Sequence, residues 1–181
     1  MHTLDVVIEE VEWRSTQVGE PPEDLVVGLT ELLVDAVASG ASVSFTGGIT
    51  LDEARQWWRK TLGSFSDRDV LLVARDATGI VGSVYVSGCW QPNQQFRGEV
   101  MKLLVHRRAR RRGVANSLME AIETRAREIG LTLLVLDTNA GSDADRLYQR
   151  RGWNRVGEIP EYSLQADGSK AASAFFYLKL T

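Results

Sequence analysis

The sequence predicts an α/β fold in which helices cover both faces of a mixed β-sheet. The apolar patterns follow one another as a strand and two helices, then three strands, then a helix, a strand, a helix and two closing strands. Elements that each bury one apolar side pack best as a sheet between layers of helices. The chain has 181 residues, 44% of them hydrophobic, which suffices for the core of a single domain over residues 1–181.

The N-terminal part of the chain predicts one strand and two helices. Residues Val6–Val11 are rich in β-branched side chains, which favours a strand. A helix follows over residues 23–39, because a proline pair opens it, leucines recur at helical spacing, and Gly40 ends it. The second helix begins after Thr50, where Glu53 completes a capping box, and continues to residue 63.

The middle of the chain predicts a hairpin, a third strand and a long helix. Residues Val70–Arg75 and Ile80–Ser87 flank a turn sequence, and Glu99–Val105 follows after a loop. One apolar stripe over residues 114–129 indicates a helix. The continuous apolar run Leu131–Leu136 predicts a strand covered on both faces.

The C-terminal part predicts a short helix and two strands. Ser142 is a good N-cap for a helix that ends near Gly152. Residues Trp153–Glu158 and Ala174–Leu180 then form the two closing strands.

Composition narrows the class of protein. The 21 basic and 24 acidic residues give a net charge of −3, which argues against bulk attraction to nucleic acid or to an anionic membrane. No apolar run approaches the ~20 residues of a membrane span, and the N-terminus lacks a secretory signal pattern. The single cysteine, Cys89, fits a reducing cytoplasm, and the two histidines form no metal-binding cluster. We expect a cytoplasmic protein that holds no metal.

The most informative segment joins the third central strand to the long helix. Residues 107–112 contain five arginines, and Gly113 follows directly before the helix. A glycine lets the backbone approach a ligand closely, while the first helical turn presents free N–H groups and the positive end of the helix dipole. This arrangement predicts a pyrophosphate site. The same residues also fit a solvated basic loop or a nucleic-acid patch.

Two motifs resemble the GNAT acetyltransferases. Arg110-x-x-Gly113-x-Ala115 is similar to their [QR]-x-x-G-x-[GA] motif, and residues 144–153 are similar to their A-x-x-L-Y-x-x-x-G-[FW] segment. The resemblance implies a mixed, mostly antiparallel sheet flanked by helices, with acetyl-CoA as cosubstrate. It implies that the strand before the arginine run splays from its neighbour. The cofactor contacts that it implies are Leu103, Leu104, Val105, Arg110, Arg111, Arg112, Gly113, Val114, Ala115, Asn116, Ser142 and Tyr148.

The chain departs from the family pattern at three positions. Arg107 stands where a proline is common, and Arg111 replaces the first glycine of the R-G-x-G version. Gly141 stands where an asparagine often contacts pantetheine. Ser142 or Asn139 are the available substitutes, although Ser142 is equally well explained as a helix cap.

A narrower resemblance spans most of the chain. Residues 40–43, 136–138, 140–142 and 155–162 are similar to the tabtoxin-resistance acetyltransferases. That branch transfers acetyl from acetyl-CoA to the amine of a small amino-acid-like antibiotic. Because the two histidines form no recognisable arrangement with Cys89, we expect direct transfer in a ternary complex rather than an acyl-enzyme. A protein or peptide amine, or a noncatalytic acyl-CoA sensor, remains an alternative. Similar enzymes are often homodimers.

The reaction requires an acid and a base. The resemblance assigns Tyr148 as the acid that protonates the departing thiolate, and a backbone N–H near Val105 would meet the oxyanion. Either Asp137 or Glu99 serves as the base: the narrower branch favours Asp137 and the superfamily favours Glu99. Cys89 has no histidine arranged beside it in sequence, and we expect a buried, unreactive thiol.

The substrate pocket is less distinct in the sequence. Aromatic residues could line it, but Trp57 and Trp58 are adjacent on one helix. They point in different directions, so at most one of them faces a ligand.

Overall fold

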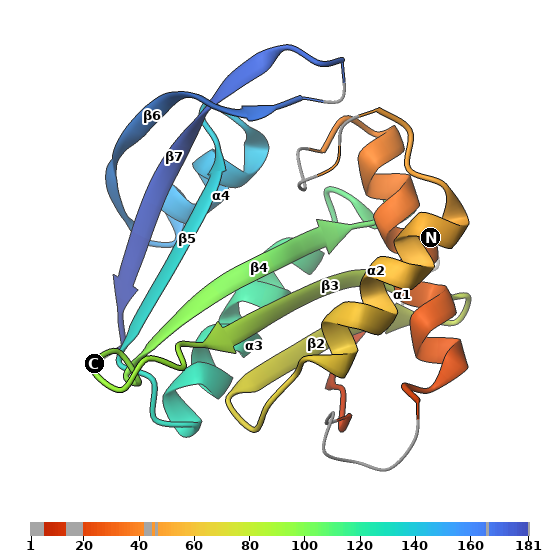
Figure 1. Cartoon of the computed structure of the whole chain (residues 1–181), viewed down its shortest axis with the longest axis horizontal. Coiled ribbons are helices and arrows are strands. Elements are labelled where there is room, and N and C mark those ends of the chain that lie inside the picture. Colours follow the sequence, from red (N-terminus) through yellow and green to blue (C-terminus); the bar gives the residue numbers. More distant parts are fainter. Residues whose placement is uncertain (1–5, 14–19, 42–44, 46, 166, 181) are drawn as a thin grey trace.

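The computed structural model describes residues 6–13, 20–41, 45, 47–165 and 167–180, and there the chain forms a seven-stranded sheet with helices on both faces (Figure 1). The order of elements is the predicted one. Both closing strands are longer than the sequence indicates. The elements are β1 (Val7–Glu10), α1 (Glu23–Ala38), α2 (Leu51–Gly63), β2 (Asp69–Asp76), β3 (Gly79–Gly88), β4 (Arg97–Val105), the 3-10 turn η1 (Arg107–Ala109), α3 (Val114–Glu128), β5 (Leu133–Asn139), α4 (Asp143–Arg150), β6 (Asn154–Leu164) and β7 (Lys170–Lys179).

The sheet is mixed and mostly antiparallel, as expected. Its strand order is β1-β2-β3-β4-β5-β7-β6, so β1 and β6 are the edges. Strands β4 and β5 are parallel, and the other neighbours are antiparallel. The parallel pair arises because α3 crosses over between β4 and β5.

Strands β4 and β5 pair at one end and then separate. Among the described residues, their ladder joins Arg97 to Leu133, Gly98 to Leu134 and Glu99 to Val135, while β4 continues to Val105. Figure 1 shows the two strands diverging from this point. Beyond Glu99 the facing backbone edges of β4 and β5 are therefore not joined by a ladder. This is the splay that the family resemblance implies.

A β-bulge in β4 lies on the splayed part. The register with β3 shifts by one residue, from Tyr85 opposite Met101 to Ser83 opposite Leu104. Lys102 has φ of 51°, in the left-handed region, and its carbonyl accepts a hydrogen bond from the Ser83 hydroxyl at 3.1 Å. The extra residue breaks the alternation of side chains, so that Met101 and Lys102 both face α2.

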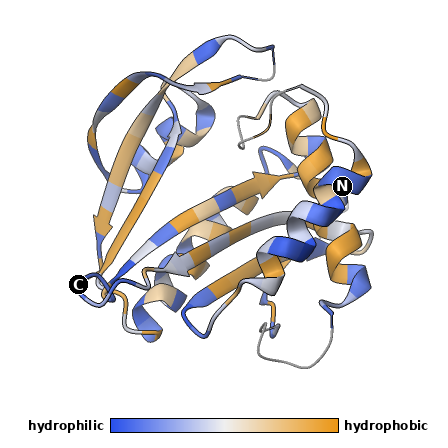
Figure 2. Cartoon of the chain, in the orientation of Figure 1, coloured by the Kyte–Doolittle hydropathy of each residue, from blue (hydrophilic) through white to orange (hydrophobic). Residues whose placement is uncertain are grey.

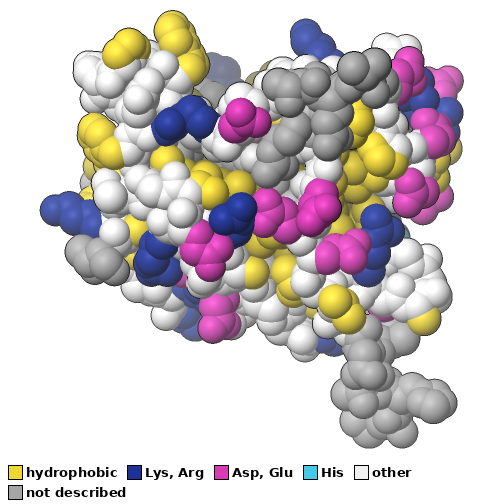
Figure 3. Space-filling model, turned by 90° about the horizontal axis from the view of Figure 1, so that it is seen from below, with side chains coloured by type: hydrophobic (Ala, Val, Ile, Leu, Met, Phe, Trp, Pro, Cys, Tyr) yellow, Lys and Arg dark blue, Asp and Glu magenta, His cyan; other side chains and the backbone are white. Residues whose placement is uncertain are grey.

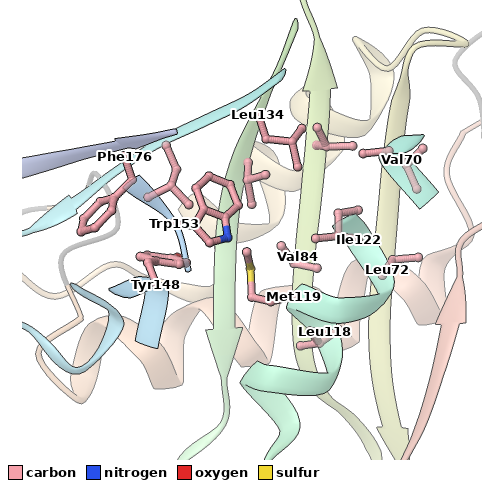
Figure 4. Close-up of a cluster of buried hydrophobic side chains, with 14 of the residues drawn as sticks. Val70, Leu72, Val84, Leu118, Met119, Ile122, Leu134, Tyr148, Trp153 and Phe176 are labelled. Atoms are coloured by element: carbon pink, nitrogen blue, oxygen red, sulfur yellow. The ribbon is translucent and has the colours of Figure 1, made fainter. Parts of the chain in front are cut away.

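Two apolar clusters fill the two faces of the sheet. Helices α1 and α2 pack on one face with Trp58 and Leu104 fully or almost fully buried. Helices α3 and α4 pack on the other, where Met119, Tyr148 and Phe176 meet (Figure 4). Figure 2 shows the apolar residues concentrated on the sheet and on the inward sides of the helices.

Strand β5 is covered on one face only, which corrects the expectation of a strand covered on both. Leu134 and Leu136 are buried against the α3 side, whereas Leu133 and Val135 are half-buried and Asp137 is exposed. Helices α1 and α2 lie over β2 to β4 and leave this face of β5 open (Figure 1). The open face borders the separation of β4 and β5, and it becomes the second wall of the candidate site.

Candidate active site

The loop between β4 and α3 has the backbone that an anion requires. Arg111 and Gly113 have positive φ values of 61° and 82°, and Gly113 is the N-cap of α3. A Cβ placed on Gly113 would meet no atom within 4 Å, so the space beside it is open. The first-turn amides of α3 have no partners within the helix, because four N–H groups are unpaired at any helix start. The loop therefore fits the pyrophosphate of a CoA ester.

Two arginines of the run hold the loop in place. The Arg107 amide donates to Asp35 of α1 at 2.9 Å, and its guanidinium pairs with the same carboxylate. Arg108 pairs with Asp76 of the β2–β3 hairpin at 2.6 Å. Burial raises the pKa of both carboxyls, but their hydrogen bonds and ion pairs outweigh it, so that each pKa lies below its usual value. Arg107 thus anchors the loop at the position where proline is common.

The other arginines divide between the strand and the surface. Arg110 donates to the Val105 carbonyl at 3.1 Å, which fixes the end of β4. Arg111 and Arg112 are exposed. The pKa of Asp143 is lowered first by its hydrogen bond to Arg146 and also by the charge of Arg111, which places Arg111 near the start of α4. On the face shown in Figure 3, acidic and basic side chains are interspersed, so no continuous basic surface covers it.

The strand residues predicted to contact the cofactor face both sides of the sheet. Leu103 and Val105 lie half-buried toward α3, and Leu104 is buried toward α1 and α2. Only the backbone of Leu104 can reach a ligand on the α3 side. Val114 is likewise buried, so its amide is the group available to a phosphate.

Asn116 takes part in a network that joins α3 to α4. Its side-chain oxygen accepts a hydrogen bond from Arg151 at 2.7 Å. Arg151 also pairs with the buried Glu123 at 2.8 Å, and the Trp153 indole donates to the same carboxylate at 2.9 Å. The network sets the position of α4 relative to α3. Ala115 lies half-buried in the first turn of α3.

Ser142 is the N-cap of α4, as its sequence context predicts. Its hydroxyl accepts a hydrogen bond from the Asp145 amide at 3.1 Å. Asp145 is buried and in turn accepts from the Gly141 amide at 2.7 Å and from Gln149 at 2.6 Å. These bonds define the start of the helix that carries Tyr148.

Tyr148 lies in the α3-side core with its ring 5% exposed. The ring contacts Trp153 and Phe176 at centroid distances of 5.8 and 5.7 Å (Figure 4). Burial, and then the charge of Asp137, raise the pKa of the phenol above its usual value. The phenol therefore stays protonated at neutral pH, the state that an acid needs.

The two candidate bases occupy different places. Asp137 is exposed on the part of β5 that no longer pairs with β4, and its charge acts on both Tyr148 and Lys102. Glu99 is at the last paired position of β4. Burial, and then the charge of Glu99, raise the pKa of Tyr85 to about 12, so Glu99 lies nearer to the α2-side core. Of the two carboxylates, Asp137 is the one that lies beside the separation of β4 and β5.

A group of side chains around Trp57 of α2 lies on the same side of the sheet as the open face of β5. The Lys102 ammonium lies over the Trp57 ring, 5.0 Å from its centroid, and Phe45 meets the same ring edge-on at 5.9 Å. Trp58 is fully buried, so at most one of the two tryptophans faces a ligand, as predicted. Lys102 was not expected here, because a β-bulge has no sequence signal of its own.

Cys89 is distant from these groups and is not buried, which corrects the expectation of a buried thiol. It lies half-buried after β3, where its amide bonds the carbonyl of Arg97 at the start of β4. Burial raises the pKa of the thiol, but hydrogen bonds and the charge of Arg97 lower it more. Val105 is at the other end of β4, so Cys89 is not placed to accept an acetyl group in this site.

Within the described part of the chain, no group of three His, Cys, Asp or Glu side chains could hold a metal. None of the described helices is long and apolar enough to cross a membrane. Residues Ser42 and Val43, which carry part of the narrower resemblance, lie outside the described residues.

The fold and the family comparison identify the class of protein. A family model described as the acetyltransferase (GNAT) family matches residues 37–153. This chain belongs to that family, as its two motifs predict.

The curated relatives are named as acetyltransferases of two methionine derivatives. The L-methionine sulfoximine/L-methionine sulfone acetyltransferases of Pseudomonas aeruginosa and Pseudomonas paraeruginosa are each 34% identical to this chain over 93 residues, 50% of the chain and 54% of the relative. The chain thus spans about half the length of the curated relatives it matches.

Solved structures share the fold over nearly the whole chain. An N-acetyltransferase from Staphylococcus aureus Mu50 has a TM-score of 0.77 at 18% identity, covering 98% of this chain and 99% of that one. A phosphinothricin acetyltransferase from Sinorhizobium meliloti, solved with acetyl-CoA, has a TM-score of 0.74 at 16% identity, covering 97% and 88%. At these identities the likeness shows the fold alone.

Proposed function

We propose that this protein is an N-acetyltransferase that moves the acetyl group of acetyl-CoA to the amine of a small, amino-acid-like molecule. The observation that carries the proposal is the separation of β4 and β5 between the Gly113 loop and Asp137, whose charge also acts on Tyr148. The curated relatives, which are named for two amino-acid substrates, support the substrate class.

The loop and the two separated strands would hold the cosubstrate. The amides around Gly113, with Arg111 and Arg112 at the surface, bind the pyrophosphate. The β4 backbone over residues 103–105 lies along the pantetheine arm, with Ser142 at the start of α4 on its other side. When bound, acetyl-CoA supplies a thioester carbonyl that an amine can attack directly.

The chain's own groups manage the protons. An alkylamine with a pKa of ~10.4 is only about 0.04% neutral at pH 7, so exposing its lone pair costs about 4.6 kcal/mol. Asp137 accepts this proton, directly or through a water. A backbone N–H near Val105 donates to the oxygen that becomes negative, and the Tyr148 hydroxyl gives its proton to the leaving sulfur. Cys89 lies at the other end of β4 from Val105 and takes no part, so transfer is direct.

The proposal also covers the domain organisation, the cellular location, the partners and the biological role. The chain acts as one domain over residues 1–181, works in the cytoplasm as a homodimer, and has no nucleic-acid or membrane partner. Detoxification of an amino-acid-like antibiotic is the biological role that fits such a substrate. Three of the five loop arginines bind groups of the chain itself, which supports a phosphate site rather than a nucleic-acid patch.

Calorimetric titration with acetyl-CoA tests the loop. Gly113→Glu should abolish binding, because it places bulk and negative charge where the pyrophosphate binds. Gly130→Glu is the matched control: Gly130 follows the other end of α3, has φ of 85°, and also has open space around it. Equal affinities in the two variants would contradict the loop assignment. Wild-type protein that binds acetyl-CoA but acetylates no member of an amine panel would be a sensor.

A further inference from the structure

Asp35 is an acidic residue in the last turn of α1, at the helix end that carries partial negative charge. In that turn, which the structure describes in full, no basic residue offsets it. Its side chain is nevertheless only 9% exposed. A carboxylate that is nearly buried at a helix C-terminus needs partners from elsewhere in the chain. These partners come from the loop between β4 and α3.

Asp35 binds both the backbone and the side chain of Arg107. Its Oδ2 atom accepts a hydrogen bond from the Arg107 amide at 2.9 Å, and Oδ1 pairs with the guanidinium. The Nε2 atom of His106 lies 3.6 Å from Oδ1. The Arg107 side chain is 58% exposed, so the ion pair alone contributes little. The bond to the amide matters more, because it fixes the direction in which the backbone leaves β4.

The backbone at this turn would also accept a proline. His106 has ψ of 140°, in the extended region that a following proline requires. Arg107 is the first residue of η1, a helical position at which the fixed φ of proline fits. A proline would hold the turn through its ring and would have no N–H to donate. In this chain the turn is held by the hydrogen bond from the Arg107 amide to Asp35.

The anchored turn directly precedes the backbone that faces the phosphates. Arg110 bonds the end of β4, and Arg111 then has φ of 61° before Gly113 begins α3. The left-handed conformation disfavours a residue with a Cβ, and it persists only where the surrounding structure holds it. If the turn is released from Asp35, Arg111 can relax toward negative φ, and the amides that follow it then rotate away from the phosphates.

We propose that Asp35 is a positioning residue that acts through the Arg107 amide and holds the Gly113 loop in the conformation that binds the pyrophosphate of acetyl-CoA. The inference rests on the proposed function and adds to it a residue that sets cosubstrate affinity. Asp35 acts on the loop and takes no part in proton or acetyl transfer. A loop that is competent for only a fraction of the time binds its ligand more weakly by that fraction.

Calorimetric titration with acetyl-CoA tests the role of Asp35. Asp35→Ala should raise the Kd by about 10- to 100-fold, as expected when charge-assisted hydrogen bonds that hold the loop are lost. With the best acceptor of an amine panel, kcat at saturating acetyl-CoA should change by less than about threefold, because the bound loop is again in place. Glu23→Ala is the matched control, because Glu23 is also an acid of α1 that pairs with an arginine, Arg59, at the other end of the helix. It should leave the Kd unchanged.

Arg107→Pro distinguishes positioning of the loop from general packing. Proline removes the N–H and the guanidinium but holds the same turn, so the Kd of this variant should lie within about threefold of wild type. Adding Asp35→Ala to Arg107→Pro should then raise the Kd by less than about threefold, because Asp35 no longer has an amide to hold. An Asp35 that only stabilises the fold would weaken binding equally in both backgrounds.

Asp35→Asn keeps the test decisive if Asp35→Ala does not fold. Asparagine has nearly the same shape but places an NH2 group where an oxygen meets Arg107, so the Kd should rise by at least about threefold. Thermal unfolding of each variant establishes that the protein is folded. A wild-type Kd in the folded Asp35 variants, or equal losses with and without Arg107→Pro, would overturn the role of Asp35 and leave the acetyltransferase function standing. Wild-type protein that binds no acetyl-CoA would instead overturn the proposed function, and this inference with it.

Discussion

The Tyr148 side chain is buried, and the charge of Asp137 also acts on its phenol. Its ring is held by Trp153 and Phe176 in the α3-side core, and the carboxylate of Asp137 acts on its hydroxyl from the open side of β5. Burial and that negative charge both favour the protonated phenol, so the pKa lies above its usual value. The residue therefore carries its proton at neutral pH, before any proton is transferred.

Tyr148→Phe should lower kcat by about 10²- to 10⁴-fold, the usual contribution of a positioned acid. The affinity for acetyl-CoA should change little, because the ring and its packing remain. Steady-state kinetics and calorimetry on the same preparation measure the two quantities. A variant with wild-type kcat would remove Tyr148 as the acid.

Asp137→Asn and Glu99→Gln should separate the two candidate bases. We expect the larger loss of kcat/KM at pH 7 for Asp137→Asn, because Asp137 lies on the unpaired part of β5 and Glu99 on the paired part of β4. Raising the pH to 9 should partly rescue Asp137→Asn, since the neutral fraction of the amine rises about tenfold per pH unit. Deprotonation of Tyr148 would not lower kcat/KM between pH 7 and pH 9, because its raised pKa keeps the phenol protonated. If both variants keep wild-type rates at pH 7, neither carboxylate is the base.

At the level of elements, the N-termini of α3 and α4 position the loop and the helix that form the candidate site. Gly113 begins α3 in the left-handed region, and Ser142 begins α4 with a side-chain cap. The Asn116–Arg151 hydrogen bond links the two helices, so the loop and Tyr148 are connected through one network. Residues assigned to the cofactor by family resemblance therefore also have structural roles.

Two variants distinguish whether Ser142 only caps α4 or also contacts the cofactor. Ser142→Ala should lower the free energy of unfolding by about 1 kcal/mol, because the Asp145 amide loses its cap. Ser142→Asn should restore most of this stability, since asparagine caps as well as serine but has no hydroxyl. Chemical denaturation measures stability and calorimetry measures acetyl-CoA affinity. Weaker binding in both variants is expected if the hydroxyl contacts the cofactor; unchanged binding in Ser142→Asn would make Ser142 a cap alone.

For the whole molecule, the unusual surface is the β6 edge of the sheet. Strand β6 has 11 residues, and its apolar side chains Val156, Ile159, Tyr162 and Leu164 are 69%, 47%, 50% and 48% exposed. The same strand carries Arg155, Glu158, Pro160 and Glu161, so its exposed apolar side chains, rather than its backbone edge, form the candidate contact surface. A second copy of the chain is the partner that the family resemblance suggests.

Sedimentation velocity should therefore detect a dimer, and Ile159→Lys should shift it toward monomer. Val7→Lys is the matched control, because Val7 is 60% exposed on β1 at the opposite edge of the sheet. The control should leave the dimer intact. A wild-type monomer at all concentrations would contradict the homodimer.

Much of the fold and part of the site could be predicted from the sequence. Periodicity placed the helices and most of the strands within a few residues, since each pattern reflects which side of an element is buried. The two closing strands extend up to six residues beyond the predicted bounds. The capping box at Thr50 and Glu53 is confirmed, with bonds of 2.9 and 3.2 Å. The prediction that both faces of β5 are covered was wrong. An apolar run indicates that a strand is apolar, but it does not indicate which helix lies over each face.

The sequence by itself determined the order of elements, the glycine at the start of α3 and the GNAT motifs, because these depend on neighbours along the chain. The tertiary structure decided which arginines stay at the surface, since Asp35 and Asp76 come from distant segments. It also decided that Asp137 lies on the unpaired part of β5 and Glu99 on the paired part of β4, and that Lys102 turns toward Trp57. These arrangements depend on the register between strands and on a bulge, and both are set only when the sheet assembles.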